Sequence, residues 1–215
     1  MSIIDIIIRV FVLLFALSVH EAAHAWAALK LGDPTASHMG RITLNPIAHI
    51  DPIGTIIFPL ILIVMRVPFL FGYAKPVPVN PLNLRNPKRD NLLISAAGPL
   101  SNLAVAVIAF IGIIILKFLD PNLFVSRERF SYLILLILYN FIILNVILAT
   151  FNLIPVPPLD GSGVLMGFLS DESAQKYDQI RPYGMIIIIV LFMTGVFSAV
   201  FSIVYGIIIF FMRLL

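Results

Sequence analysis

The stretch FALSVHEAAHAWAALK, residues 15–30, places two histidines and a glutamate in a run that otherwise reads as a membrane-spanning helix. Even on the lenient insertion scale, a charged side chain at the centre of such a helix costs about 2.5–3.5 kcal/mol. Ionisable groups are retained there only when a function compensates for this cost. His20, Glu21 and His24 therefore indicate a functional site within the membrane.

The composition is that of an integral membrane protein. Of the 215 residues, 60% are hydrophobic and 12% are charged, about half of the roughly 25% charged residues of soluble domains. The net charge is +3 and the basic residues are spread over short connections, which fits positive-inside topology and argues against nucleic-acid binding. There is no cysteine, so a bound metal would need imidazole and carboxylate ligands.

The apolar runs predict an all-α polytopic membrane protein with about four transmembrane helices. These runs cover residues 3–31, 91–116, 130–159 and 182–212. The segment 52–65 has 14 uncharged residues and ends at Arg66. Because this length is short for a full crossing, we expect 52–71 to be re-entrant or interfacial. The polar, turn-rich stretch 32–52 is predicted to form a short β-hairpin.

The distribution of positive charge predicts the orientation. The loop 72–91 has the densest positive charge, from Lys75, Arg85, Lys88 and Arg89, and should be cytoplasmic. With a re-entrant 52–71 segment, the helices that carry HEAAH and the later PPLDG are parallel, and both motifs lie toward the cytoplasmic face. A full crossing by 52–71 would make these two helices antiparallel.

The sequence His20-Glu21-Ala22-Ala23-His24 matches the pattern H-E-x-x-H. On a helix, positions i and i+4 share a face, so both imidazoles can bind one zinc ion. Glu21 lies about 100° around the helix and can act as a general base toward a water molecule whose pKa zinc lowers to about 7. The alternatives are a chance match or a pair of structural polar residues.

A catalytic zinc site usually has three protein ligands, and Asp160 is the strongest candidate for the third. It ends a 30-residue uncharged run in which Pro155, Pro157 and Pro158 break the helix. The alternative role for Asp160 is an N-cap of the next segment. We expect His38 and His49 to be interfacial or to lie behind the ligands rather than to bind the metal.

Three motifs in order, HEAAH (20–24), AAGPLSN (96–102) and NLIPVPPLDG (152–161), resemble the site-2 protease family of intramembrane zinc metalloproteases. The resemblance covers roughly residues 10–165. It implies that His20, His24 and Asp160 bind one Zn²⁺ per chain. It also implies that Glu21 is the catalytic base.

The same resemblance implies further site residues. Gly98 and Asn102 match the GxxxN element of the family, and Asn152 lies where the family has an asparagine proposed to contact substrate or the oxyanion. Each also has a structural alternative: Gly98 as a packing or kink site, and the two asparagines as interhelical hydrogen-bonding residues. The same predicted helix also contains Asn140 and Asn145, so an asparagine there does not by itself identify a functional residue.

We expect one membrane-embedded metalloprotease domain over residues 1–215, with a core over 3–165 and a C-terminal transmembrane helix over 183–213. The short 117–129 loop and the ending at Leu215 lead us to expect a minimal member without the PDZ or CBS domain of many relatives. The expected reaction is hydrolysis of peptide bonds within or near transmembrane segments of membrane-protein substrates. The region 36–58 is predicted to offer an unwound substrate a strand edge.

The expected location is the lipid bilayer of a prokaryotic plasma membrane, with the active site toward the cytoplasmic face. The main alternative function is a divalent-metal transporter or metal-binding membrane protein, since transporters also bury ionisable residues. The few acidic residues in the spans and the lack of a visible internal repeat disfavour transport. A catalytically dead scaffold is disfavoured because candidate ligands and base are all present.

Overall fold

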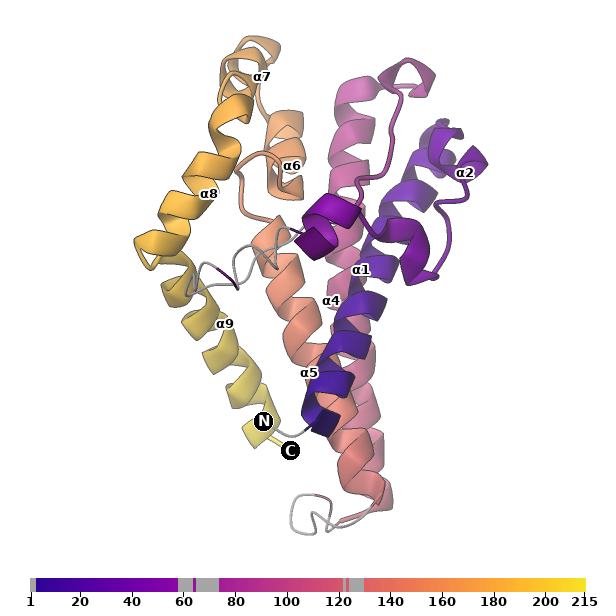
Figure 1. Ribbon diagram of the computed structural model, residues 1–215, viewed down its shortest axis with the longest axis vertical. Helices are drawn as coiled ribbons and strands as arrows, with labels where there is room; N and C mark the ends of the chain where they lie inside the picture. Colours follow the sequence, from indigo (N-terminus) through magenta and orange to yellow (C-terminus); the bar gives the residue numbers. More distant parts are fainter. Residues whose placement is uncertain (1–2, 58–63, 65–73, 122, 124–129) are drawn as a thin grey trace.

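The computed structural model describes residues 3–57, 64, 74–121, 123 and 130–215. Three long helices form its centre: α1 (Ile3–Leu31), α4 (Pro87–Leu119) and α5 (Phe130–Asn152). Figure 1 shows that α4 runs antiparallel to α1 and α5. With α9 (Val196–Arg213), these are the helices of the described chain that are long and apolar enough to cross a membrane. The predicted all-α, multi-pass membrane architecture is confirmed.

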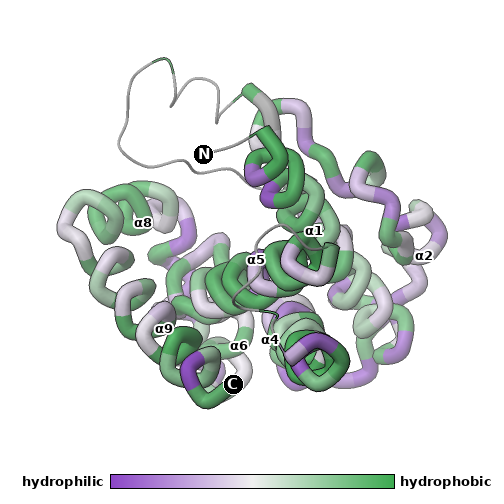
Figure 2. The backbone as a smooth tube through the Cα atoms, turned by 90° about the horizontal axis from the view of Figure 1, so that it is seen from below, coloured by the Kyte–Doolittle hydropathy of each residue, from purple (hydrophilic) through white to green (hydrophobic). Residues whose placement is uncertain are grey.

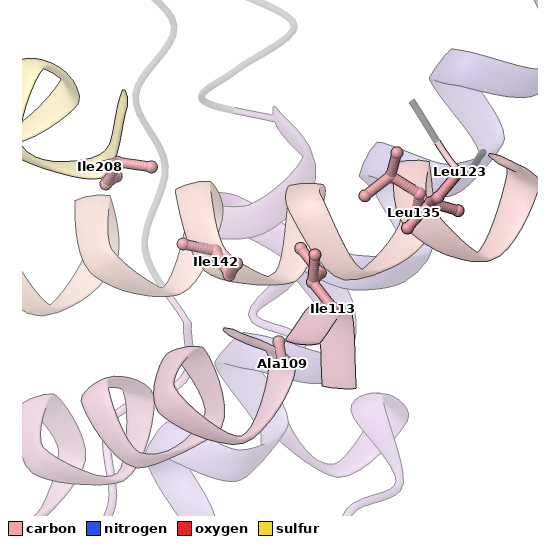
Figure 3. Packing of buried hydrophobic residues seen from close by; sticks show 6 residues of the cluster. All are labelled: Ala109, Ile113, Leu123, Leu135, Ile142 and Ile208. Carbon is pink, nitrogen blue, oxygen red and sulfur yellow. The ribbon is translucent and has the colours of Figure 1, made fainter. Parts of the chain in front are cut away.

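Some hydrophobic residues pack between the helices, and others lie on the outside of the bundle. One buried cluster joins α4, α5 and α9 (Figure 3) through Ala109, Ile113, Leu123, Leu135, Ile142 and Ile208. Figure 2 shows that hydrophobic residues dominate α5 and α8 along their length. Many large apolar side chains are exposed on the outside, among them Phe11, Ile108 and Ile203. Such side chains are stable against lipid tails, so packing between the helices depends on close contact.

Local signals set where α4 begins. The side chain of Asn86 accepts a hydrogen bond from the Arg89 backbone N–H, and Pro87 occupies the first turn, where its missing N–H costs nothing. The carboxylate of Asp90 accepts a hydrogen bond from the Asn86 N–H at 2.8 Å. These reciprocal bonds resemble a capping box, with Asp90 one position later than usual, and they satisfy otherwise unpaired donors at the helix start.

The predicted β-hairpin is wrong. No described residue forms a strand, and the stretch 32–52 instead contains the short helix α2 (Thr35–His38) and the 3₁₀ turn η1 (Pro46–His49). Asp33 accepts hydrogen bonds from the backbone and hydroxyl of Thr35, and Asn45 caps η1. These local bonds compete successfully with strand pairing. The strand edge expected at 36–58 for substrate therefore has no basis.

Asp33 also ties this stretch to the connection before α4. Its fully buried carboxylate accepts hydrogen bonds from the Asn80 N–H at 2.7 Å and from the Asn83 side chain at 2.8 Å, in the turn η3 (Pro81–Asn83). The guanidinium of Arg41 donates to the backbone carbonyl of Lys75. Two loops that are about 40 residues apart in sequence are thus held together beside the end of α1.

The predicted re-entrant segment falls mostly outside the described residues. Its first part forms the π-helical turn η2 (Pro52–Ile57). Residues 58–63 and 65–73 are not among those described. The re-entrant path of 52–71 therefore stays a prediction.

After α5 the chain follows an irregular path over 153–159 and then enters α6 (Asp160–Phe168), α7 (Asp171–Asp178), η4 (Arg181–Tyr183) and α8 (Gly184–Met193). The helix predicted over 183–213 is in fact the two helices α8 and α9. They are separated at Gly195, whose φ of +79° lies in the left-handed region that glycine tolerates. No PDZ or CBS domain lies in the part of the chain that the structure describes.

Candidate metal centre

Three side chains from two distant parts of the chain meet at one point. His20 and His24 lie one turn apart on α1, and Asp160 is the first residue of α6. The two Nε2 atoms are 3.1 Å apart. Asp160 Oδ2 lies 3.0 Å from His20 Nε2 and 3.3 Å from His24 Nε2. These atoms form a nearly equilateral triangle, and both histidines are more than nine-tenths buried.

The geometry of this triangle fits a metal ion. Tetrahedral zinc with ligands at about 2.0–2.1 Å places neighbouring ligand atoms roughly 3.3–3.4 Å apart. The observed separations of 3.0–3.3 Å are close to that value. The donor set of two imidazoles and one carboxylate is also one that zinc favours in catalytic sites.

The hydrogen bonds behind the triangle support the same interpretation. His20 Nδ1 lies 2.7 Å from Asn102 Oδ1, and His24 Nδ1 lies 2.7 Å from the Ile94 carbonyl oxygen. Because both neighbours are acceptors, each Nδ1 carries the proton and each Nε2 presents a lone pair. Asp160 Oδ2 is buried and has no hydrogen-bond donor. Three electron-rich atoms face one another, and a shared cation would stabilise them.

Gly98 lets α4 approach the two histidines. A Cβ at this position would lie 2.3 Å from His24 Nε2 and 2.7 Å from His20 Nε2. No side chain fits within those distances, so the histidines can adopt this arrangement only against a glycine. Gly98 therefore lies directly against the Nε2 atoms of the two histidines.

A second set of glycines places Asp160. A Cβ at Gly163 would lie 2.1 Å from Ser95 Oγ, and one at Gly167 would lie 2.4 Å from Leu92 Cδ1. Close packing of α6 on α4 therefore depends on these two glycines, which lie on the same helix face. Asp160 is one turn before Gly163, so this packing carries its carboxylate to the histidines. The G-x-x-x-G spacing in GVLMG (163–167) is the sequence signal for this close packing, and the predictions from hydropathy and ligand motifs did not include it.

The remaining predicted residues are not part of the triangle. Glu21 is buried on α1 next to His20. Asn152 ends α5 and donates to the Leu148 carbonyl of its own helix at 3.1 Å. His38 is exposed. His49 is buried and pairs with the Thr43 carbonyl at 2.9 Å, and the metal-ligand cluster found among the described residues contains neither of them.

The two roles weighed for Asp160 can now be compared. The N-cap position of α6 is occupied by Leu159, whose backbone is extended, and Asp160 follows it inside the helix. The Asp160 carboxylate contacts both histidines. The geometry therefore favours a ligand over a cap. Together, the helical membrane architecture and this donor set point to a membrane-embedded metal-binding protein.

Comparisons with known proteins agree with this class. Residues 128–195 match the model of peptidase family M50. The chain is 40% identical to YwhC of Bacillus subtilis, named as a zinc metalloprotease, over 191 residues that cover 89% of this chain and 82% of YwhC. It is 29% identical over 181 residues to Rip2 of Mycolicibacterium smegmatis, also named as a zinc metalloprotease, covering 84% of this chain and 64% of Rip2. No solved structure matches significantly.

The chain belongs to peptidase family M50, the site-2 protease family. It is an intramembrane zinc metalloprotease with Zn²⁺ as cofactor. The resemblance found in the sequence is confirmed. The divalent-metal transporter is not favoured.

Proposed function

We propose that His20, His24 and Asp160 are the protein ligands of the catalytic zinc ion and that Glu21 is the general base of peptide hydrolysis. The observation that carries this proposal is the triangle of three lone-pair atoms, each 3.0–3.3 Å from the next. Bound there, zinc supplies a Lewis acid and lowers the pKa of water, which makes water a nucleophile at neutral pH.

The protein's own residues then have distinct tasks. The triangle would supply three ligands to zinc, and a catalytic zinc site with three protein ligands keeps its fourth position for water or substrate. Glu21, one residue beyond His20, accepts a proton from the attacking water and returns it to the amine nitrogen as the peptide C–N bond breaks. The oxygen of the water ends in the new carboxylic acid, whose remaining proton passes to the released amine at neutral pH, so atoms and charge balance. We retain a contact with substrate or the oxyanion as the proposed role of Asn152.

We propose substrates with a single transmembrane segment that unwinds locally. A helix hides its carbonyl groups in its own hydrogen bonds, so the scissile carbonyl must leave the helix before it can react. The site joins the C-terminal half of α1 to the first residue of α6. From Ile3 to His20 is 17 residues, or roughly 26 Å of helix, most of a hydrocarbon core of about 30 Å.

We place the active site toward the cytoplasmic face of a prokaryotic plasma membrane. The connection before α4 carries Lys75 and Arg85, and α4 begins with Lys88 and Arg89, a charge density typical of cytoplasmic loops. The relatives reported above are bacterial proteins. We also propose that residues 1–215 act as one domain, because the ligands join α1 to α6.

The test compares the wild type with Glu21→Gln on a panel of single-span substrates in liposomes, with zinc content measured in both. We expect the wild type to cleave within a span and the zinc-loaded variant to lose at least about 100-fold in rate, the scale of general base catalysis. Glu172→Gln is the matched control, because Glu172 is exposed on α7 and pairs only with Lys176 among the described residues. Cleavage by Glu21→Gln at the wild-type rate would disprove the base assignment.

A further inference from the structure

We propose that Asn102 and Asn145 form a polar relay that orients His20 for metal binding, so that a residue of α5 outside all three motifs sets the zinc affinity of the site. The proposal rests on the metal-ligand role of His20 given above. Both asparagines are positioning residues, since they act on the metal only through His20. The observation is a continuous set of buried side-chain hydrogen bonds across three helices.

The orientation of the Asn102 amide is determined by its neighbours. Asn102 is fully buried, and its Nδ2 lies 3.1 Å from the Ala16 carbonyl and 2.8 Å from Asn145 Oδ1. The Ala16 carbonyl oxygen is an acceptor. Asn145 Oδ1 is an acceptor as well, because the amide nitrogen of Asn145 bonds to its own helix. Nδ2 therefore donates to both, and Oδ1 is left to accept from His20 Nδ1 at 2.7 Å.

The orientation of Asn145 is determined in the same way. It is fully buried, and its Nδ2 donates to the Phe141 carbonyl of its own helix at 2.8 Å. Its Oδ1 consequently faces Asn102. Each bond in the series has one donor and one acceptor, from the α5 backbone through Asn145 and Asn102 to His20 on α1.

The relay determines which nitrogen of His20 can bind metal. When Nδ1–H donates to Asn102, the lone pair remains on Nε2, which faces His24 and Asp160. For His24 the same task falls to the backbone carbonyl of Ile94, which a side-chain substitution does not remove. The two asparagines should therefore act on one ligand of the three, and groups of this kind typically change metal affinity about 10–100-fold.

Asn145 differs from the other asparagines of α5. Asn140 donates to the Leu136 carbonyl and Asn152 to the Leu148 carbonyl, each one turn back in the same helix. Asn145 makes this bond too, but it also reaches Asn102 on α4. Asn140 is thus a matched control, with the same residue type, the same helix and the same local bond.

The experiment measures the zinc dissociation constant in detergent by competition with a chromophoric chelator. The variants are Asn102→Leu, Asn145→Leu, the double variant and Asn140→Leu, with the melting temperature of each metal-free protein as a check on folding. We expect Asn102→Leu to bind zinc about 10–100-fold more weakly and Asn145→Leu to bind it several-fold more weakly. Asn140→Leu should bind like the wild type.

Two further variants keep the test decisive. Asn145→Ala removes the acceptor without adding bulk, so it replaces Asn145→Leu if that variant does not fold. Asn102→Asp keeps an acceptor for His20 and should bind zinc more tightly than Asn102→Leu. Because Asn145 acts through Asn102, the double variant should bind no more weakly than Asn102→Leu alone.

Wild-type affinity in the folded Asn145 variants would overturn the relay, and so would losses that multiply in the double variant. His24→Ala separates this result from a failure of the proposed function. If His24→Ala binds zinc like the wild type, the ligand assignment itself is wrong. If His24→Ala loses zinc while the asparagine variants keep it, the ligand assignment stands and the relay is disproved.

Discussion

The imidazoles of His20 and His24 lie against the backbone of α4 at Gly98, where a Cβ would come within 2.3 Å of His24 Nε2. A glycine at this point does more than allow close helix packing, because it leaves room for the candidate ligand atoms themselves. The polar groups of the first membrane helix are thereby accommodated. Their Nδ1 atoms have hydrogen-bond partners, and their Nε2 atoms converge with Asp160 Oδ2.

This contact predicts the effect of Gly98→Ala. The new methyl group cannot occupy the space of the Nε2 atoms, so one or both histidines must turn away. We expect zinc affinity to fall by about tenfold or more, the low end of the effect of disturbed ligand surroundings, and proteolysis to fall with it. A chelator competition assay measures the affinity.

Gly206→Ala is the matched control for this prediction. Gly206 lies in α9, and a Cβ there would have no atom of the described residues within 4 Å apart from its chain neighbours and its own helix backbone. We expect this variant to keep wild-type zinc affinity. Equal affinity of Gly98→Ala and the wild type would mean that α4 does not approach the histidines as closely as the structure has it.

At the scale of the elements, the Asp33 carboxylate holds together the two loops of the connection between α1 and α4. Burial alone would raise the pKa of Asp33, but hydrogen bonds from Asn83, from Thr35 and from the Asn80 backbone outweigh it and lower the pKa from 3.8 to about 2. The charged form is therefore favoured in the folded protein. Asp33 stabilises the junction that holds α2 and η3 beside the end of α1.

This junction predicts a pH dependence. A carboxylate whose pKa is lowered on folding contributes stability that is present above its unfolded pKa of about 3.9 and is lost as the pH falls through the folded value. We expect Asp33→Asn to cost about 1–3 kcal/mol at pH 7, the range for a buried polar group that loses its partners. The difference in melting temperature from the wild type should shrink between pH 4 and pH 2.

Thermal unfolding in detergent at pH 7, 4 and 2 measures this difference. Asp171→Asn serves as the comparison, because Asp171 is exposed on α7 and pairs with Lys88 at the surface. Exposed pairs of this kind contribute little. A difference in melting temperature between Asp33→Asn and the wild type that stays constant at all three pH values would contradict the stabilising role of the Asp33 carboxylate.

In the whole molecule, the metal-ligand triangle joins parts of the chain that are far apart. His20 and His24 belong to α1, and Asp160 belongs to the region after α5, about 140 residues later in the sequence. Between them lies α4, which packs on α1, α5 and α6. A bound zinc ion would therefore hold α6 against the three central helices.

This arrangement predicts that removal of zinc destabilises the bundle. A ligand that binds only the folded state stabilises it by about 4 kcal/mol when its free concentration is a thousand times its dissociation constant. Chelation should lower the melting temperature, and added zinc should restore it. Calorimetry of the protein in detergent measures both changes.

His24→Ala, which lacks one candidate ligand, should melt at nearly the same temperature with and without added zinc. A wild-type protein that is stripped of zinc and melts at the zinc-loaded temperature would contradict the prediction. That outcome would mean that the packing of α6 on α4 through Gly163 and Gly167 suffices without the metal.

Hydropathy and residue spacing were sufficient to predict the membrane helices and many residues of the candidate site. The runs at 3–31, 91–116 and 130–159 correspond to α1, α4 and α5, because membrane helices satisfy their own backbone and are read from local composition. The spacing of His20 and His24 predicts a shared helix face for the same reason. The third candidate, Asp160, was singled out by the prolines before it and by the family resemblance.

Local side-chain hydrogen bonds and contacts between helices account for what the sequence did not reveal. The hairpin expected at 32–52 became α2 and η1, since Asp33 and Asn45 make local hydrogen bonds that alternating hydropathy does not report. The space that Gly98 leaves for two imidazoles, and the reach of Asn145 to Asn102, exist only where α1, α4 and α5 pack together. Hydropathy and helical period record each helix separately, whereas these features depend on how neighbouring helices are positioned within a few tenths of an ångström.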